Sequence, residues 1–337
     1  MAKVSVIGAG SWGTALAMLL AGNGHDTILW SHREEQAAEL SKTREHKAKL
    51  PGVILPKELK ITSNLEQAAK ERDVLVLAVP SVVVRETSKK LKACVLPGQL
   101  IVNVAKGIEA HTLTTLTDMI EEELPGVHAC VLSGPSHAEE VSRGLPTTCV
   151  VGARDKKTAE YLQNIFMSPV FRVYISPDIL GIELGGALKN VIALAAGIAD
   201  GLGYGDNTKA ALITRGIAEI ARLGVKMGGK IETFTGLTGI GDLIVTCASV
   251  HSRNRKAGYL IGQGRSMQEA MDEVQMVVEG VYSAKAAAKL AKKYDVPMPI
   301  VEEVNKVLFE GKSPAEAVDD LMLRESRSEH RALQWEK

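Results

Sequence analysis

The chain has 337 residues, and its 40 basic and 40 acidic side chains leave a formal net charge of zero. This length exceeds that of one typical domain and favours two. The balanced charge argues against nucleic acid or a charged membrane surface as a partner, because both require a basic excess. Four scattered cysteines without a Cys-x-x-Cys pair favour a reducing cytosol and predict no metal site.

The longest apolar stretch, 179–202, does not predict a membrane span. It is interrupted by charged and polar residues, which are Glu183, Lys189, Asn190 and Asp200. Such residues are costly inside a bilayer, so this stretch predicts the buried helix of a soluble protein. The apolar run at the N-terminus is too short for a signal peptide and meets a glycine turn.

The first half of the sequence alternates short β-branched runs with helical segments. The expected strands are Lys3–Ile7, Thr27–Trp30, Val74–Val79, Leu100–Val104, His128–Leu132, Thr147–Gly152 and Phe171–Ile175. The expected helices include Gly13–Gly22, Ser81–Leu91 and Thr112–Leu124. This alternation predicts an α/β domain at 1–176 with a parallel sheet covered on both faces.

Helical periodicity dominates after Ser176-Pro177. The expected helices are Asp178–Leu202, Thr208–Met227, Met267–Val274, Ser283–Tyr294, Ile300–Phe309 and Pro314–Leu323. Start signals stand at Ser266, Ser283 and Ser313. We therefore expect an all-helical domain at 177–337, with a charged, loosely docked tail after Leu323.

A glycine-rich turn, 8–13, follows the first expected strand and opens the first helix. Its GxGxxG spacing is weak evidence alone, but in this context it is typical of a Rossmann-like, doubly wound dinucleotide-binding sheet. Gly8 permits the tight turn, Gly10 lets the backbone approach a pyrophosphate, and Gly13 lets helix and strand pack closely. The helix N-terminus adds free N–H groups for the phosphates. The alternative is a glycine turn without a ligand.

The end of the second expected strand bears on the choice of dinucleotide. NAD-specific sites usually carry an acidic residue there, whereas this chain has Ser31-His32-Arg33. An Arg suits a 2′-phosphate, and Glu34 and Glu35 are assigned to the next helix. This pattern favours NADPH over NADH; a solvated surface Arg33 is the alternative.

Ligands of open α/β sheets bind beyond the carboxyl ends of the strands, and three such ends carry suggestive residues: Val79-Pro80-Ser81, Ala105-Lys106-Gly107 and Ser133-Gly134-Pro135-Ser136. Lys106 follows a hydrophobic run, so its ammonium group is delivered to that edge. The Ser133-Gly134-Pro135-Ser136 turn offers N–H groups and a hydroxyl to an anion. An exposed lysine and a plain loop are the alternatives.

A Lys189-Asn190 pair interrupts a helix that is apolar nearly all round. Lysine is rarely buried without a partner, because removing its charge from water is expensive. Gly185, Gly186, Ala193 and Ala196 share its helix face and are expected to leave room for a ligand. The alternative is a structural ion pair of Lys189 with an acid such as Glu183 or Asp200.

Further polar residues lie downstream. Asp242 and Thr246 are one helical turn apart and would point the same way, as candidate substrate contacts. The segment 251–255 forms a cationic cluster, for which a solvated loop is the alternative.

Taken together, these motifs resemble the bacterial type of NAD(P)-dependent glycerol-3-phosphate dehydrogenase. The residues that carry the resemblance occur in the family's order, and they are 8–13, 102–107, 133–136, 188–190, 239–243 and 252–254. The resemblance implies a Rossmann-like domain, a helical domain and a site between them. It also implies reduction of dihydroxyacetone phosphate to sn-glycerol 3-phosphate, which supplies glycerophospholipid synthesis.

The resemblance assigns roles to individual residues. It makes Lys189 the catalytic proton donor and acceptor. The implied substrate contacts are Lys106, Gly134, Ser136, Asp242, Ser252, Arg253 and Asn254. The implied cofactor contacts are Ser11, Trp12, His32, Arg33, Lys106, Ala138, Arg253 and Glu279. We also expect a homodimer in the cytoplasm.

The chemistry agrees with these roles. Hydride arriving at a ketone carbon leaves negative charge on oxygen, which needs a nearby cation that supplies a proton. Lys106 and an apolar wall would lower the pKa of Lys189, while Asp242 could orient it. A guanidinium such as that of Arg253, with Asn254 beside it, suits the substrate's phosphate.

Two other functions remain open at this point. β-Hydroxyacid and 6-phosphogluconate-type dehydrogenases share the glycine turn and a Lys-Asn pair. Asp242 and Ser252-Arg253-Asn254 favour a glycerol-3-phosphate dehydrogenase over these enzymes. A dinucleotide sensor without turnover is the second alternative.

Overall fold

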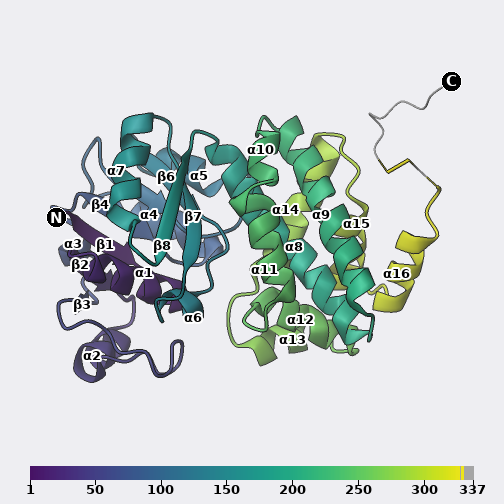
Figure 1. Ribbon diagram of the computed structural model, residues 1–337, viewed down its shortest axis with the longest axis horizontal. Helices are drawn as coiled ribbons and strands as arrows, with labels where there is room; N and C mark the ends of the chain where they lie inside the picture. Colours follow the sequence, from purple (N-terminus) through teal and green to yellow (C-terminus); the bar gives the residue numbers. More distant parts are fainter. Residues whose placement is uncertain (327, 330–337) are drawn as a thin grey trace.

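An eight-stranded sheet with helices on both faces is followed along the chain by an all-helical region, and the two lie side by side (Figure 1). The computed structural model describes residues 1–326, 328 and 329. Residues 327 and 330–337, which belong to the expected helical domain and its tail, lie outside the described residues. The predicted fold class is confirmed.

The strands closely match the predicted runs, with one addition. They are β1 (Lys3–Ile7), β2 (Asp26–Trp30), β3 (Lys60–Thr62), β4 (Val74–Leu77), β5 (Leu100–Asn103), β6 (His128–Ser133), β7 (Thr147–Gly152) and β8 (Phe171–Ser176). Their order in the sheet is β3-β2-β1-β4-β5-β6-β7-β8. The first six strands have the order of a Rossmann fold. The short edge strand β3 was not predicted.

The sheet is mixed rather than purely parallel, so that part of the prediction was wrong. β6 and β7 pair antiparallel, with Val131 opposite Gly152, while every other neighbouring pair is parallel. A parallel return needs a long crossover, usually through a helix. The connection after β6 holds only the four-residue helix α6 (Ala138–Val141), so β7 returns in the opposite direction.

The other helices of the first region cover the two faces of the sheet. They are α1 (Ser11–Gly22), α2 (Glu34–Thr43), α3 (Leu65–Ala69), α4 (Val84–Leu91, preceded by the 3₁₀ turn η1, Ser81–Val83), α5 (Leu116–Glu123) and α7 (Lys156–Phe166). α5 begins after Thr112, the predicted start, because Thr115 caps it by accepting a hydrogen bond from the backbone N–H of Asp118.

The second region is helical throughout the part of the chain that the structure describes. Its elements are α8 (Ile179–Gly201), α9 (Asp206–Lys226), α10 (Ile231–Phe234), the π-helical turn η2 (Leu237–Gly241), α11 (Asp242–Ala248), α12 (Arg253–Gly262), α13 (Met267–Val274), α14 (Glu279–Lys293), α15 (Pro299–Phe309) and α16 (Pro314–Met322). Ser266 and Ser313 cap α13 and α16 with complete capping boxes, as predicted. Ser283 does not begin a helix, because α14 already starts at Glu279 and Ser283 is a buried residue within it.

Helix α8 is the centre of the helical region (Figure 1). It is long and apolar enough to cross a membrane, but 89% of its apolar window is buried inside the fold, as in the core helix of a globular protein. Helix α12 packs directly on α8. A Cβ on Gly197 would lie 2.1 Å from the carbonyl oxygen of Arg255, and one on Gly258 would lie 2.1 Å from that of Leu194. These contacts fix the start of α12 relative to α8.

The glycine turn between β1 and α1 has the geometry that its spacing predicts. Gly8 has a φ of +123°, a conformation that side chains disfavour. A Cβ on Gly13 would lie 1.9 Å from the carbonyl oxygen of Gly8, so helix and strand could not pack as they do. A Cβ on Gly10 would meet nothing within 4 Å, because this glycine faces open space.

Candidate active site

A cavity of about 410 Å³ lies where the carboxyl ends of the parallel strands face α8, α11 and α12. The glycine turn lines one wall, and Lys189, Asp242 and Arg253 line the other. Of the predicted site residues, only Gly13 and Gly134 do not line it. Gly13 lies beneath the turn, and Gly134 acts through its carbonyl group.

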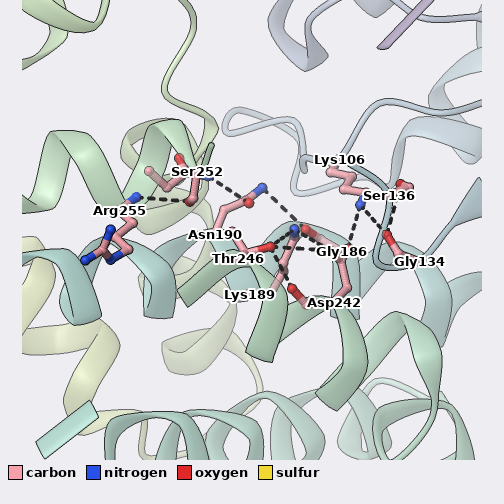
Figure 2. Close-up of polar contacts among 11 residues, drawn as sticks. Lys106, Gly134, Ser136, Gly186, Lys189, Asn190, Asp242, Thr246, Ser252 and Arg255 are labelled. Atoms are coloured by element: carbon pink, nitrogen blue, oxygen red, sulfur yellow. Dashed lines mark hydrogen bonds and ion pairs between the residues drawn. The ribbon is translucent and has the colours of Figure 1, made fainter. Parts of the chain in front are cut away.

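Two lysines from different regions meet on one buried carboxylate (Figure 2). Lys189 on α8 donates to Oδ1 of Asp242 at 2.6 Å, and Lys106, from the loop after β5, donates to Oδ2 at 2.6 Å. Lys189 is 5% exposed and Asp242 is 1% exposed. The sequence places these residues 53 and 136 positions apart, so only the fold brings them together.

The electrostatics of this group favour proton transfer at Lys189. Burial, together with the positive charge of Lys106, lowers the pKa of Lys189 to about 8, against the opposing effect of Asp242. Burial disfavours the charge of Asp242, but Lys106 and Lys189 hold its pKa below the ordinary value. The carboxylate therefore stays charged, while the lysine titrates near neutral pH.

The remaining partner of Lys189 is Thr246, one turn after Asp242 on α11. Its hydroxyl accepts from Lys189 and donates to the backbone carbonyl of Asp242 at 2.6 Å. The side chains of Asp242 and Thr246 therefore point the same way, as predicted, and both contact Lys189. Neither Glu183 nor Asp200 pairs with Lys189: Glu183 accepts from Thr117, and Asp200 pairs with other cations.

The expected room beside Lys189 is absent at its neighbouring glycines. A Cβ on Gly185 would lie 2.6 Å from the carbonyl oxygen of Thr238, and one on Gly186 would lie 3.2 Å from the hydroxyl of Ser133. These two glycines admit protein atoms rather than a ligand, so the prediction of room for a ligand was wrong at Gly185 and Gly186. The ligand space lies instead toward the cavity that Lys189 and Asn190 line.

The Ser133–Ser136 turn holds Lys106 in place (Figure 2). The carbonyl oxygen of Gly134 accepts from Lys106 at 3.0 Å and from the hydroxyl of Ser136 at 3.1 Å. The loop before Lys106 is also supported. The side chain of Asn103 donates to the backbone carbonyl of Ala105 and accepts from the backbone N–H of Ala105, both at 3.1 Å. The Asn103 amide also donates to the carboxylate of Glu183 at 3.4 Å.

Asn103 and Glu183 were not among the predicted site residues. Both are buried, and Glu183 lies two turns before Lys189 on the same helix. Burial raises the pKa of Glu183 to about 7, although Thr117 donates to it. The only signal in the sequence for Asn103 was its position as a polar residue within the apolar run 100–104, at the end of β5.

The N-terminus of α12 points one cation and several polar groups at the cavity. Ser252 caps this helix by accepting from the N–H of Arg255 at 3.2 Å. Asn254 is held by two bonds, donating to Asn190 at 2.9 Å and accepting from the N–H of Gly280 at 2.8 Å. The guanidinium of Arg253 has no hydrogen bond or ion pair with any described residue. The arrangement suits an anion at a helix N-terminus.

The opposite end of the cavity is built from the end of β2. Ser31, His32 and Arg33 follow Trp30, and α2 begins at Glu34, so the two glutamates belong to the helix as predicted. The hydroxyl of Ser31 accepts from the N–H of Arg33 at 3.2 Å and donates to Gln36 at 2.6 Å. His32 and Arg33 both line the cavity.

Glu279 joins the two regions across the cavity. It accepts from the backbone N–H of Ser81 at 3.0 Å and from the Ser81 hydroxyl. Burial raises its pKa, and the two bonds from Ser81 only partly offset this. Ser81 follows β4. The sequence singled it out at a strand end and as the start of an expected helix, but not as a partner of Glu279.

The cavity fits a dinucleotide. The open space at Gly10 leaves the turn accessible to a pyrophosphate, and unpaired cations line the two ends. Within residues 1–326, 328 and 329, no group of three or more His, Cys, Asp and Glu side chains is placed to hold a metal ion. A dinucleotide cradle that faces a buried Lys–Asp pair defines a dinucleotide-dependent oxidoreductase.

Comparison with known proteins gives the particular family. Models of the NAD-dependent glycerol-3-phosphate dehydrogenase N-terminus and C-terminus match residues 3–159 and 178–319. A glycerol-3-phosphate dehydrogenase (NAD(P)+) of Fusobacterium nucleatum is 62% identical over 98% of this chain and 99% of its own length. The enzyme of the same name from Agathobacter rectalis is 63% identical over 99% of this chain and 100% of its own length.

A solved structure agrees with these matches. The crystal structure of glycerol-3-phosphate dehydrogenase from Coxiella burnetii superposes with a TM-score of 0.92 at 36% identity, covering 96% of this chain and 99% of the other. The chain belongs to the NAD(P)-dependent glycerol-3-phosphate dehydrogenase family, which confirms the resemblance carried by the motifs.

Proposed function

We propose that this enzyme reduces dihydroxyacetone phosphate to sn-glycerol 3-phosphate, with Lys189 as the proton donor. The observation that carries the proposal is the buried Lys189–Asp242 pair, 2.6 Å apart, on the wall opposite the dinucleotide cradle. A lysine with a pKa near 8 supplies and recovers a proton at neutral pH. The product is a precursor of glycerophospholipids.

The residues divide the work at the carbonyl group. The bound dinucleotide supplies hydride to the carbonyl carbon. Lys189 donates a proton to the carbonyl oxygen as negative charge develops there. Asp242 holds the ammonium group in position, and Lys106 adds a second positive charge beside it.

The substrate's phosphate is assigned to the start of α12. Arg253 offers a planar guanidinium, and the N-terminal residues of α12 line the same cavity. Ser252 and Asn254 complete the polar surface, and Ser136 with Gly134 supports it from the sheet side. Thr246 contributes by holding Lys189.

An assay of several substrates tests this function. NADPH oxidation with dihydroxyacetone phosphate is compared with oxidation in the presence of hydroxy and keto acids. Turnover of dihydroxyacetone phosphate alone supports the proposal. Turnover restricted to the acids would indicate a β-hydroxyacid-type dehydrogenase, and cofactor binding without any turnover would indicate a sensor.

We further infer a preference for NADPH over NADH. The support is Arg33 at the end of β2, where no carboxylate stands to repel a 2′-phosphate. The Arg33→Ala variant should bind NADPH about tenfold more weakly, a loss of about 1.4 kcal/mol, with NADH affinity nearly unchanged. Fluorescence titration measures both, and an equal loss for the two cofactors would contradict the assignment.

Three further expectations complete the proposal. We expect a domain boundary between 1–176 and 177–337, because the sequence pattern changes at Ser176-Pro177, with the cofactor on the first domain and Lys189 on the second. We propose a cytoplasmic homodimer, in keeping with four free cysteines and a soluble enzyme family. Size-exclusion chromatography with light scattering tests the dimer, and fractionation of cells tests the compartment.

A further inference from the structure

Three cations, Arg33, Lys49 and Arg253, line the cavity without a hydrogen bond or ion pair to another described residue. The charge of Arg253 nevertheless opposes the rise that burial causes in the pKa of Glu279. Lys49 was not predicted from the sequence and has no role in the chemistry above. Burial lowers its pKa, and the charges of Arg253 and Arg33 lower it further. Cations that repel one another around a cavity favour an anionic ligand there.

Lys49 lines the part of the cavity that also includes Arg33. A smaller neighbouring cavity shares three lining residues with the main one, and these are Arg33, Gln36 and Lys49. Arg33 and Gln36 belong to the segment that follows β2. Lys49 is therefore adjacent to the group expected to meet a 2′-phosphate.

The segment that carries Lys49, between α2 and β3, is clamped to the glycine turn. Nε2 of His46 lies 3.0 Å from the carbonyl oxygen of Ala9, which can only accept, so Nε2 carries the proton of this bond. The backbone N–H groups of Lys49 and Leu50 bond back to the carbonyl of His46 at 3.0 and 2.8 Å. Leu50 is 1% exposed, so this turn is packed into the core.

We propose that Lys49 is a second cation for the 2′-phosphate of NADPH and, together with Arg33, determines the preference for the phosphorylated dinucleotide. This inference rests on the proposed function, from which the cofactor's orientation is taken. The reason is electrostatic. A phosphate monoester carries about −1.5 to −2 charges at pH 7, more than one guanidinium balances. The pyrophosphate already has the N–H groups of the glycine turn.

Lys49→Gln tests the proposal, because glutamine keeps a long polar side chain and removes the charge. The affinity for NADPH should fall about tenfold, and the affinity for NADH should change less than about twofold. Direct fluorescence titration without substrate gives both values. Lys49→Arg should retain the wild-type ratio of the two affinities. Lys49 is only partly buried, so these variants are expected to fold, which circular dichroism checks.

Lys47→Gln is the matched control, since it removes the same charge from an exposed side chain two residues away that lines the smaller cavity but not the main one. It should leave both affinities unchanged. A second readout uses pH: below about pH 6 the 2′-phosphate gains a proton, so wild type should lose NADPH affinity there more steeply than Lys49→Gln does.

Three results would overturn the proposal. If Lys49→Gln lost the same affinity for NADPH and for NADH, Lys49 would be a pyrophosphate contact. If it lost no affinity for either cofactor, Lys49 would be a solvated lysine. If Lys47→Gln lost as much NADPH affinity as Lys49→Gln, the effect would come from the overall positive charge of the segment and not from Lys49. The proposed function fails separately, by absence of turnover of dihydroxyacetone phosphate in the wild-type enzyme, because the titrations contain no substrate.

Discussion

The two walls of the cavity are built in different ways. On the sheet side, backbone atoms make the surface: Gly8 and Gly13 shape a turn, and Gly10 leaves it open. On the helical side, buried side chains make it, with Lys189, Asp242 and their neighbours bonded to one another. The first wall depends on six consecutive residues. The second depends on residues from three helices, α8, α11 and α12, together with Lys106 from the loop after β5.

This difference separates binding from chemistry. A backbone cradle recognises a diphosphate through N–H groups that every peptide unit supplies, so glycine spacing is sufficient to build it. A proton donor needs a pKa that its surroundings shift, which requires burial and charged partners from distant segments. Substitutions on the helical wall should therefore affect turnover, and substitutions on the sheet wall should affect affinity or folding.

The largest expected effect is on the helical wall. In Lys189→Met the apolar stem is kept and the ammonium group is lost, while Asp242 retains Lys106 as its partner. Proton donation of this kind contributes about 10²- to 10⁴-fold, so kcat should fall by that factor with NADPH affinity near wild type. Steady-state kinetics and cofactor titration measure the two quantities.

The same exchange at an exposed lysine, Lys226→Met on α9, provides the control and should leave kcat unchanged. If Lys189→Met retained the wild-type kcat, Lys189 would be a structural ion pair. If it lost cofactor affinity as strongly as kcat, the division between the two walls would be wrong.

Local pattern was enough to predict most of the fold. Strands β1 and β7 and helix α13 have the predicted bounds, because their β-branched runs, turn residues and serine cap act within a few positions. The direction of β7 could not be predicted in that way. It depends on how the short helix α6 turns the chain after β6, which is a property of the whole connection.

The site, like the fold, could be predicted where local sequence was sufficient and could not be predicted where contacts between distant segments decide. Lys189 stood out because a lysine within an apolar helix needs a partner, but the partner's identity came only from the packing of α11 on α8. Glu183 and Asp200 were nearer in sequence, yet neither contacts it. Lys49 and Asn103 escaped prediction because their roles depend on neighbours that the fold supplies.

The pH dependence is the next largest effect, and it tests whether the helical wall sets the pKa of Lys189. Reduction needs the protonated lysine, so kcat/KM should fall about tenfold per pH unit above about 8, while oxidation of glycerol 3-phosphate should rise until that pH. Asp242 raises the pKa of Lys189, so in Asp242→Asn both limbs should move to lower pH. If the two pH profiles of Asp242→Asn did not move, the group that titrates would be one other than Lys189.

The smallest expected effects lie on the sheet wall, where two alanine substitutions separate packing from binding. In Gly13→Ala the new Cβ would lie 1.9 Å from the carbonyl oxygen of Gly8. Overpacking of this kind costs about 1–3 kcal/mol, so the free energy of unfolding and the melting temperature should fall without cofactor present. In Gly10→Ala the Cβ meets nothing within 4 Å, so stability should hold.

The methyl group of Gly10→Ala would nevertheless occupy the space through which the pyrophosphate approaches the backbone, so NADPH and NADH affinities should both fall about tenfold. Thermal unfolding and fluorescence titration of the two variants measure the pair of effects. The opposite pattern, an unstable Gly10→Ala protein with normal affinity, would show that Gly10 supports the fold and that the dinucleotide lies elsewhere. Equal loss for the two cofactors also distinguishes this wall from Arg33 and Lys49, whose substitution should affect NADPH alone.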